Sequence, residues 1–257
     1  MALPFPNQST TMPPCSYNGR LGEMTSTDLA TRYALVIPAL NEAESIGALL
    51  EQIPHGLFSQ VIVVDNGSED RTAEVARAAG ACVVSEPRRG YGQACVRGLD
   101  RLHPDTVAVA FMDADLSDNP ADLTRLVQLF DEGRWDLVIG SRVLGNPQPG
   151  SLTHLQRFGN WLSTRLIRWL WRMSFTDLGP MRMASRRTLA ALCLRDRDFG
   201  WNVEMQAKAA RLCLRVCEIP VSYRQRTSGK SKISGTLVGS LRAGLKILWT
   251  IYRCWRM

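Results

Sequence analysis

The chain has 257 residues, of which 45% are hydrophobic and 21% are charged, a composition typical of a folded protein with a substantial core. Its seven cysteines are scattered and form no CxxC pair with zinc spacing, which argues against a disulfide framework and a structural zinc site. We expect reduced, mostly buried thiols in a cytosolic setting. The net charge is +7, but the charges are distributed unevenly along the chain. Residues 1–150 carry 11 basic and 19 acidic side chains, and residues 151–257 carry 20 basic and 5 acidic ones.

The chain begins with prolines and polar residues and has no continuous apolar core there, so we expect a disordered leader over residues 1–30 rather than a secretion signal. Short apolar runs then alternate with segments of helical periodicity. We expect strands at 33–38, 60–65, 81–86, 106–113 and 135–140, and helices at 41–53, 68–80, 91–102 and 119–133. Because these strands are apolar on both sides, the pattern predicts an α/β fold with a mostly parallel sheet flanked by helices.

The alternation changes after Gly145. The remaining expected elements are a helix at 155–173, a short strand within 177–185, a helix at 202–212, a strand at 214–223 and a final amphipathic helix. The predicted organisation is one α/β domain over 31–235 with a basic amphipathic helical extension over 236–257. No segment has the run of about 18 apolar residues that a transmembrane helix needs.

Polar clusters follow four of the predicted strands. They are Pro38 to Glu42, Asp65 to Asp70, Arg88 to Tyr91, and Asp113 to Asp118. In an open parallel sheet ligands bind beyond the carboxyl ends of the strands, so four clusters on one edge predict a binding site.

Asp113 and Asp115 are separated by one residue, so in an extended segment both carboxylates point the same way. Such carboxylates raise each other's pKa unless a cation lies between them. Mg²⁺ or Mn²⁺, with a diphosphate completing the coordination, suits this pair. The alternative is an Asx turn that begins the next helix, and we expect Asp118 to be the N-cap of that helix, before Asn119.

The other strand ends have polar groups suited to a nucleotide. A carboxylate at Asp65 can accept hydrogen bonds from a base or a ribose hydroxyl, Gly67 suits a tight turn, and Asp70 can cap a helix. The RRGYG loop after the third strand combines two cations with two glycines that allow close approach of phosphates. The absence of GxGxxG and GxxxxGK[ST] patterns argues against dinucleotide-binding and P-loop chemistry.

Eight motifs in order resemble the family 2 glycosyltransferases, with the dolichyl-phosphate mannosyltransferase and bacterial polyprenyl-phosphate branch as the nearest. The motifs, which span residues 33–235, are VIPALNEAESI, VIVVDNGSEDRT, EPRRGYGQA, FMDADLSDNP, VIGSR, DLGPMR, FGWNVEMQAKA and SGKSKISG. The resemblance implies a GT-A fold, a nucleotide-sugar donor, and a diphosphate bound through Mg²⁺ or Mn²⁺.

The resemblance also assigns roles to matching positions. It implies that Asp115, Arg142 and Asp177 are catalytic and that Asp113 and Asp115 form the DxD metal motif. The substrate-binding residues that it implies are Pro38, Ala39, Leu40, Glu42, Asp65, Gly67, Arg89, Gly90, Gln93, Asp113, Ala114, Glu204, Arg226, Lys230 and Lys232. For Asp177, a simple turn-forming role before Gly179 is the alternative.

The sequence departs from the family pattern in two places. Ser117 occupies the position where relatives often have a glutamine as third metal ligand, so a serine hydroxyl or a water is expected there. An acidic pair that would serve as general base is missing near Trp201 and Asn202. This absence favours an acceptor that is already anionic, namely a polyprenyl phosphate. The alternatives are transfer to a hydroxyl acceptor and a nucleotide-sugar-binding protein without catalysis.

The basic second half indicates an anionic partner. Trp161, Trp169 and Trp171 lie among arginines in the helix at 155–173, a pattern suited to a helix in a lipid headgroup layer. We therefore expect peripheral attachment to the cytoplasmic face of the cell membrane. The alternative is that the apolar stripes pack against the domain and leave the arginines in water. No nucleic-acid recognition motif is present, so nucleic acid is not an expected partner.

Overall fold

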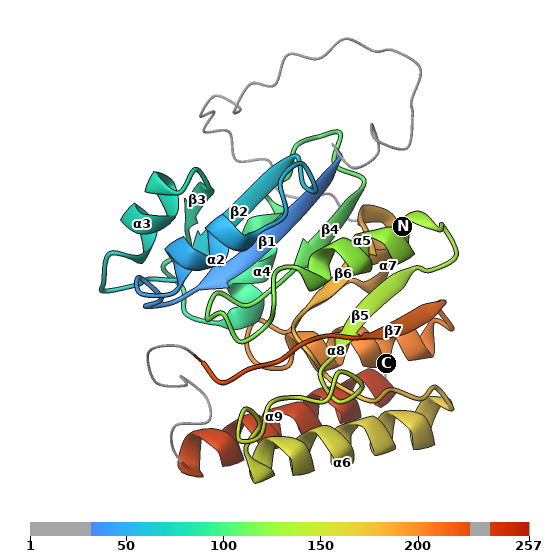
Figure 1. Ribbon diagram of the computed structural model, residues 1–257. Helices are drawn as coiled ribbons and strands as arrows, with labels where there is room; N and C mark the ends of the chain where they lie inside the picture. Colours follow the sequence, from blue (N-terminus) through green and yellow to red (C-terminus); the bar gives the residue numbers. More distant parts are fainter. Residues whose placement is uncertain (1–31, 227–236, 257) are drawn as a thin grey trace.

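The structure is a computed structural model that describes residues 32–226 and 237–256. The expected leader over residues 1–30 lies outside these residues, and so do Lys230 and Lys232. The strands are β1 (Tyr33–Ala39), β2 (Gln60–Asp65), β3 (Cys82–Ser85), β4 (Ala108–Phe111), β5 (Leu137–Ser141), β6 (Arg182–Ser185) and β7 (Val216–Pro220). They form a seven-stranded sheet in the order β3-β2-β1-β4-β6-β5-β7 (Figure 1).

The sheet is mostly parallel, as the sequence predicts. β1 pairs in parallel with both β2 and β4, β2 pairs with β3, and β5 pairs with β7. β6 is antiparallel to both of its neighbours and separates β4 from β5. The five consecutive strands predicted from the alternation are therefore not all adjacent, because the later strand β6 inserts between the fourth and the fifth.

The sheet has helices on both faces. The helices are α2 (Ile46–Gln52), α3 (Thr72–Ala78), α4 (Tyr91–Leu99), α5 (Asp122–Asp131), α6 (His154–Trp171), α7 (Arg186–Leu192), α8 (Trp201–Arg211) and α9 (Leu237–Arg256). The short helix α7 was not anticipated in the sequence. It begins at a capped turn, in which the side chain of Ser185 accepts a hydrogen bond from the backbone N–H of Thr188 (2.9 Å).

Two apolar clusters form the core, one on each face of the sheet. Along β1, Val36 belongs to one cluster, and its neighbours Leu35 and Ile37 belong to the other, because successive side chains of a strand point to opposite faces. One cluster includes residues of α2, α3 and α5; the other includes residues of α4, α7 and α8. Burial on both faces explains why these strands are apolar throughout.

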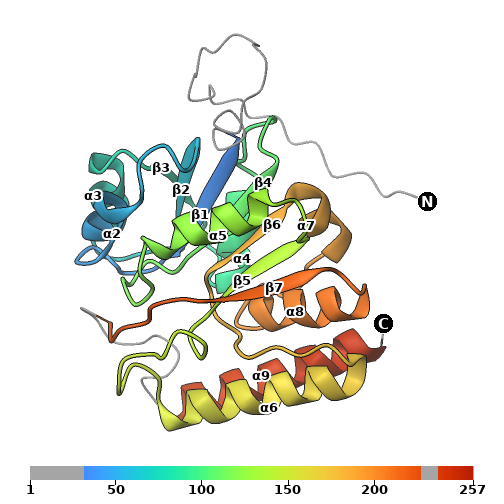
Figure 2. The same cartoon turned by 45° about the vertical axis from the view of Figure 1, so that its right-hand side comes forward.

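α6 and α9 form a further layer beyond α8. Both figures show the two long helices side by side on the same side of the molecule (Figures 1 and 2). Ile167 of α6 and Ile251 of α9 are buried in the same cluster as α8. Among the helices within the described ranges, none combines the length and the apolar character that crossing a membrane requires.

Two expectations about local structure were wrong. The helix predicted at 41–53 begins only at Ile46, because Asn41 has a left-handed backbone (φ 51°) that interrupts a helix. The thiols are free, as expected, in the described part of the chain, but they are not mostly buried. Cys95 and Cys254 are buried, whereas Cys193 and Cys213 are exposed.

We predict that Gly98 is required for the contact of α4 with β1. A Cβ atom added at Gly98 would lie 2.5 Å from Cγ1 of Val36, which is fully buried in β1. Gly98→Ala should therefore destabilise the protein by about 1–3 kcal/mol through overpacking. Gly159→Ala, on α6 where a Cβ meets no atom within 4 Å, should stabilise it by about 0.5–1 kcal/mol. Urea unfolding measures both, and equal effects would contradict this packing argument.

Candidate active site

The carboxyl ends of β1, β2, β3 and β4 lie at one edge of the sheet because these strands are parallel neighbours. In the register, Ala39 of β1 is opposite Asp65 of β2, and Asp65 is opposite Ser85 of β3. Pro38 and Ala39 end β1, and Leu40 follows directly. The polar segments after the four strands therefore come together, as the sequence predicts.

Hydrogen bonds tie the segment after β1 to the segment after β2. The backbone N–H of Asn41 donates to Oγ of Ser68 (2.9 Å), and that of Glu42 donates to Oγ1 of Thr72 (2.8 Å). In return, the N–H of Glu69 donates to Oδ1 of Asn41 (2.7 Å). The two segments form one unit, so the position of each predicted side chain there depends on both.

Asp65 and Gly67 form a tight turn at the end of β2. Oδ1 of Asp65 accepts a hydrogen bond from the N–H of Ser68 (3.0 Å), and Gly67 has a φ of +78°, which side chains disfavour. The guanidinium of Arg89 lies beside this glycine and forms an exposed ion pair with Glu69 (3.3 Å). Such an exposed pair contributes little to stability, so an anionic ligand can draw Arg89 away at small cost.

Asn66 and Glu86 hold the loop after β3. The buried amide of Asn66 donates to the carbonyls of Glu86 (2.9 Å) and Arg88 (2.7 Å), and its Oδ1 accepts from the N–H of Gly90 (2.8 Å). Glu86 accepts from Nε of Arg88 (3.0 Å) and from Nε2 of Gln93 (2.9 Å). The hydrogen bonds from Arg88 lower the pKa of Glu86 to about 2.

Asn66 and Glu86 were missed in the sequence. The available signal was their position, since each is a polar residue within two residues of the end of a buried strand. Gly90 and Gln93 were predicted to bind substrate. The N–H of Gly90 and the side-chain amide of Gln93 donate hydrogen bonds within this loop instead.

Asp115 and Glu42 share one cation, Arg226. Oδ2 of Asp115 accepts hydrogen bonds from Nε (3.0 Å) and Nη2 (2.8 Å) of Arg226, and Nη1 of the same side chain lies 3.2 Å from Oε1 of Glu42. Oδ1 of Asp115 accepts from the N–H of Ser117 (2.9 Å). The arginine follows β7, so this contact brings a segment from beyond the last strand to the segments that follow β1 and β4.

Asp113 is less satisfied than Asp115. Its Oδ1 is buried and has no hydrogen-bond partner among the described residues. Burial, together with the negative charge of Asp115, raises the pKa of Asp113 to about 7. Ala114 is buried between the two carboxylates.

A hard divalent cation fits the pair formed by Asp113 and Asp115. An unpaired buried carboxylate oxygen and a pKa raised by a neighbouring carboxylate are both relieved by a bound cation. Within the part of the chain that the structure describes, no group of three or more His, Cys, Asp or Glu side chains could hold a metal. Asp113 and Asp115 would supply two carboxylates to such a cation, and a bound ligand and water would supply the remaining oxygens.

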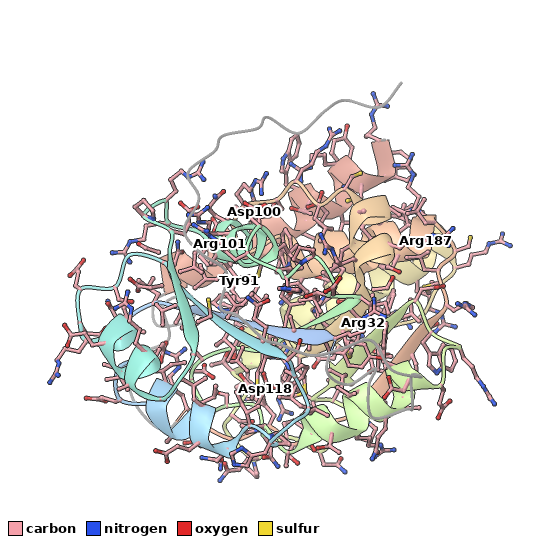
Figure 3. The ribbon with its side chains drawn as sticks, turned by 90° about the horizontal axis from the view of Figure 1, so that it is seen from above. Arg32, Tyr91, Asp100, Arg101, Asp118 and Arg187 are labelled. Carbon is pink, nitrogen blue, oxygen red and sulfur yellow. The ribbon has the colours of Figure 1, made fainter. Side chains whose placement is uncertain are left out.

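Asp118 does not cap a helix, contrary to the prediction. Helix α5 begins after Ala121, whose N–H donates to Oδ1 of Asn119 (3.2 Å). Asp118, labelled in Figure 3, is only 1% exposed, and neither of its oxygens has a partner among the described residues. Its backbone forms a β-bridge with Tyr223. Burial, and then the charge of Asp113, raise the pKa of Asp118 well above its usual value. The chain turns toward Tyr223 before the helix starts, which places this carboxyl inside.

Arg142 and Asp177, predicted separately as catalytic residues, form one buried ion pair. Nε and Nη2 of Arg142 donate to the two carboxylate oxygens at 2.7 and 2.8 Å, and the backbone N–H of Arg142 adds a third bond (2.9 Å). Burial opposes ionisation of Asp177, but the charge and hydrogen bonds of Arg142 hold its pKa below the usual value. The guanidinium lies 5.0 Å from the ring centroid of Tyr223, the residue bridged to Asp118.

The family model for glycosyl transferase family 2 matches residues 34–192. The chain is a family 2 glycosyltransferase. An uncharacterized glycosyltransferase of Mycobacterium tuberculosis is 44% identical over 211 residues, which are 81% of this chain and 93% of the relative. The undecaprenyl-phosphate mannosyltransferase of Micrococcus luteus is 32% identical over 241 residues, covering 85% of this chain and 96% of the relative.

A solved structure shows the same fold as this glycosyltransferase. It is glucosyl-3-phosphoglycerate synthase from Mycobacterium tuberculosis, in complex with Mn²⁺, uridine-diphosphate-glucose and phosphoglyceric acid. The TM-score is 0.72 at 23% identity, with 93% of this chain and 86% of that chain covered. The predicted GT-A fold is thereby confirmed.

Glu204, which the sequence predicts to bind substrate, lies among internal partners in this glycosyltransferase. The side chain is fully buried in α8, where it accepts hydrogen bonds from the N–H groups of Arg195 (2.9 Å) and Asp196 (2.6 Å). Its other oxygen lies 2.9 Å from Nζ of Lys208 and 3.4 Å from Nη2 of Arg253. With these internal partners and no exposed surface, the carboxylate of Glu204 stabilises the packing around α8 in this structure.

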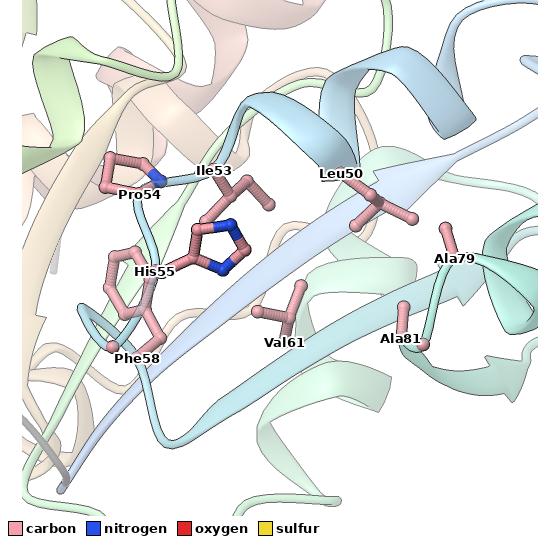
Figure 4. A pocket seen from close by; sticks show the side chains of 10 residues that line it. Leu50, Ile53, Pro54, His55, Phe58, Val61, Ala79 and Ala81 are labelled. Carbon is pink, nitrogen blue, oxygen red and sulfur yellow. The ribbon is translucent and has the colours of Figure 1, made fainter.

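A separate pocket of about 240 Å³ lies at the opposite edge of the sheet in this glycosyltransferase (Figure 4). It is lined by the end of α2, the following loop, the start of β2 and the end of α3, and the side chains shown there are mainly apolar. His55 is its one titratable residue, and none of the predicted site residues contributes to it. The pocket therefore has no part in the strand-end site.

We predict that the ionisation of Asp118 opposes folding of the glycosyltransferase at neutral pH. Because its pKa is raised in the folded state, its favourable contribution is present below the unfolded pKa of about 3.9 and is lost as the pH rises toward the folded pKa. Asp118→Asn keeps the shape without ionising. We expect its Tm at about pH 8 to exceed that of the wild type by about 2–4 °C or more, with a smaller difference at about pH 4.

Differential scanning fluorimetry across this pH range measures the difference. Glu51→Gln, at an exposed position of α2, serves as the matched control and should show no pH-dependent change. An Asp118→Asn protein that is less stable than the wild type at the higher pH contradicts the prediction.

Proposed function

We propose that this glycosyltransferase moves a hexose from a nucleoside-diphosphate sugar to a polyprenyl phosphate, with inversion at the anomeric carbon and with Mg²⁺ or Mn²⁺ as cofactor. We place the reaction at the cytoplasmic face of the cell membrane. The observation that carries the choice of acceptor is the exposed aromatic and basic surface of α6 and α9, described below. The strand-end carboxylates and arginines support the choice of donor.

The donor side of the proposal rests on the strand-end geometry. We propose that Asp65, at the end of β2, accepts hydrogen bonds from the nucleoside. Asp113, whose Oδ1 has no partner among the described residues, would hold the diphosphate through a cation together with Asp115, whose oxygens now accept hydrogen bonds from Arg226 and Ser117. A bound Mg²⁺ or Mn²⁺ would stabilise negative charge on the departing nucleoside diphosphate. Arg226 contacts both Asp115 and Glu42, so its positive charge would lie near that diphosphate and serve the same purpose.

The acceptor side requires no general base. A phosphate oxygen is already anionic, so it can attack the anomeric carbon while the bond to the donor diphosphate breaks and the leaving group takes the electron pair. Arg142 is fixed by Asp177 in a bidentate pair, and this pre-orientation suits it to hold the acceptor phosphate. Trp201, near which an acidic base was sought in the sequence, is buried in the core.

The surface of α6 and α9 supports a lipid acceptor. Exposed aromatic side chains occupy one side of each helix: Phe158, Trp161 and Trp169 on α6, and Trp249, Tyr252 and Trp255 on α9. Trp169 is 78% exposed, so the alternative in which these rings pack against the domain does not hold for it. Neither helix contains an acidic residue, and arginines lie among the rings, at 157, 165 and 168 on α6 and at 256 on α9.

Such a surface matches the interface of an anionic bilayer. Tryptophan and tyrosine favour the headgroup region, and basic side chains are attracted to anionic lipids. The undecaprenyl-phosphate mannosyltransferase of Micrococcus luteus, which resembles this chain over most of both lengths, is named for a lipid-phosphate acceptor. Both observations support the same acceptor class from independent sources.

A screen of donors and acceptors tests the proposed reaction. With Mn²⁺ and a set of UDP- and GDP-sugars, we expect transfer to undecaprenyl phosphate, detected as a glycolipid by mass spectrometry. Asp115→Asn should reduce the rate at least about 100-fold because it removes a charge from the metal site. Asp105→Asn, an exposed change before the other end of β4, should leave the rate unchanged. Transfer only to soluble hydroxyl acceptors would replace the proposed acceptor, and an active Asp115→Asn enzyme would contradict the metal role.

Binding to vesicles tests the membrane surface separately. We expect the protein to sediment with vesicles that contain anionic phosphatidylglycerol, less strongly at high salt because the attraction is screened. The double variant Trp169→Ser/Trp249→Ser should bind at least about 10-fold more weakly. Leu212→Ser, at an exposed apolar position directly after α8, should bind as the wild type does. Equal binding of the wild type and the double variant would contradict the assignment of this surface.

A further inference from the structure

Two buried carboxylates outside the strand-end site organise the segment between α7 and α8. Oδ1 of Asp196 accepts hydrogen bonds from the N–H groups of Asp198 (2.9 Å) and Gly200 (3.2 Å), which closes the segment into a compact turn. Glu204 accepts from the N–H groups of Arg195 and Asp196 and so holds the start of that turn. Both carboxylate side chains are completely shielded from solvent.

Helix α9 supplies the countercharges. Lys246, Thr250 and Arg253 are spaced so that all three lie on one face of the helix. Oδ2 of Asp196 lies 3.1 Å from Nζ of Lys246, accepts a hydrogen bond from Oγ1 of Thr250 (3.2 Å) and lies 3.8 Å from Nη2 of Arg253. Arg253 also reaches Oε1 of Glu204 (3.4 Å). The helix is thus attached to the domain by a polar contact of defined geometry as well as by apolar packing.

The backbone of the same turn is in direct contact with the segment after β3. The carbonyl of Arg197 accepts a hydrogen bond from the backbone N–H of Gln93 (2.8 Å). A Cβ added at Gly90 would lie 2.2 Å from that carbonyl oxygen, and one added at Gly92 would lie 2.3 Å from the carbonyl oxygen of Asp196. Only glycine allows the two backbones to approach so closely, so the two glycines of the RRGYG motif have a packing role that their sequence context did not show.

We propose that Asp196 is a positioning residue for the donor-binding loop. Held by Lys246, Thr250 and Arg253 of α9, it fixes the turn whose carbonyl groups set the backbone of the loop at Gly90 and of the first turn of α4, up to Gln93. The loop in turn lies beside Asp65, where the nucleoside is proposed to bind. The inference rests on the proposed donor role of that loop, and it makes α9 part of the support of the donor site.

A purely stabilising role for this network is the less economical explanation. A buried ion pair contributes little net stability, because the desolvation of both charges offsets their attraction, and apolar residues of similar size serve as well. The ionic contact adds a defined geometry. One oxygen of Asp196 accepts hydrogen bonds from two backbone N–H groups, and the other contacts three side chains of α9. Such a contact specifies the position of the turn relative to α9.

The test separates the position of the loop from the stability of the fold. Lys246→Met removes one cation at a partly exposed position and leaves Arg253 to neutralise Asp196, so the fold should survive; Asp196→Asn is the stronger second variant. In both, hydrogen exchange followed by mass spectrometry should show faster exchange in a peptide containing the Gln93 amide, with β1 and β2 unchanged. The donor KM should rise about 5- to 20-fold, with kcat within about twofold of the wild type.

Arg215→Met is the matched control. It breaks another ion pair, with Asp136 at 2.9 Å, that does not touch the loop, so exchange near Gln93 and the donor KM should not change. Unchanged exchange near Gln93 in both test variants overturns the inference, and so does faster exchange with an unaltered donor KM. Because the exchange measurement uses the protein without an acceptor, a failure of the proposed polyprenyl-phosphate reaction is recognised independently in the acceptor screen.

Discussion

The contact of Arg226 with Asp115 and Glu42 is the constraint on which the candidate active site depends. Parallel pairing of β1, β2, β3 and β4 brings their carboxyl ends to one edge, and with them a concentration of negative charge. A cation from beyond β7 balances two of these carboxylates. Some basic side chains of the second half of the chain therefore neutralise carboxylates of the first half. Only the other basic side chains can bind an external anionic partner.

The carboxylates at this edge differ in how far they are compensated. Asp177 has a bidentate arginine and stays ionised, and Asp115 shares Arg226 with Glu42. Asp113 and Asp118 have buried oxygens that find no partner within the described part of the chain. Leaving such groups unpaired in a folded protein is costly. A divalent cation would stabilise the carboxylate of Asp113, the member of the DxD pair that has an oxygen without a partner among the described residues. The feature that destabilises the site by itself is therefore also the one that would bind the cation.

In the layer formed by α6 and α9, α9 has two different surfaces: one contacts the domain and the other is exposed. One side of α9 is polar and meets Asp196, while the other exposes Trp249 and its aromatic neighbours. An amphipathic helix usually packs through its apolar side. α9 packs inward through buried apolar residues such as Ile251 and Cys254 and, beside them, through the ionic contact with Asp196. Its exposed aromatic rings form a second apolar surface in addition.

The linear pattern established the α/β class, the strands β1 to β4, the family and the clustering of polar groups at the strand ends, because apolar periodicity and strand direction are local properties. It did not reveal the antiparallel insertion of β6, since strand order depends on contacts between residues far apart in the chain. It assigned a capping role to Asp118 because Asp and Asn favour helix starts, and it assigned substrate binding to Glu204 from the resemblance of its segment to the family. Only the tertiary structure decided their burial, the pairing of Arg142 with Asp177, and the approach of Arg197 to Gln93. Each of these depends on which distant segment fills the space beside a side chain, and no local pattern carries that information.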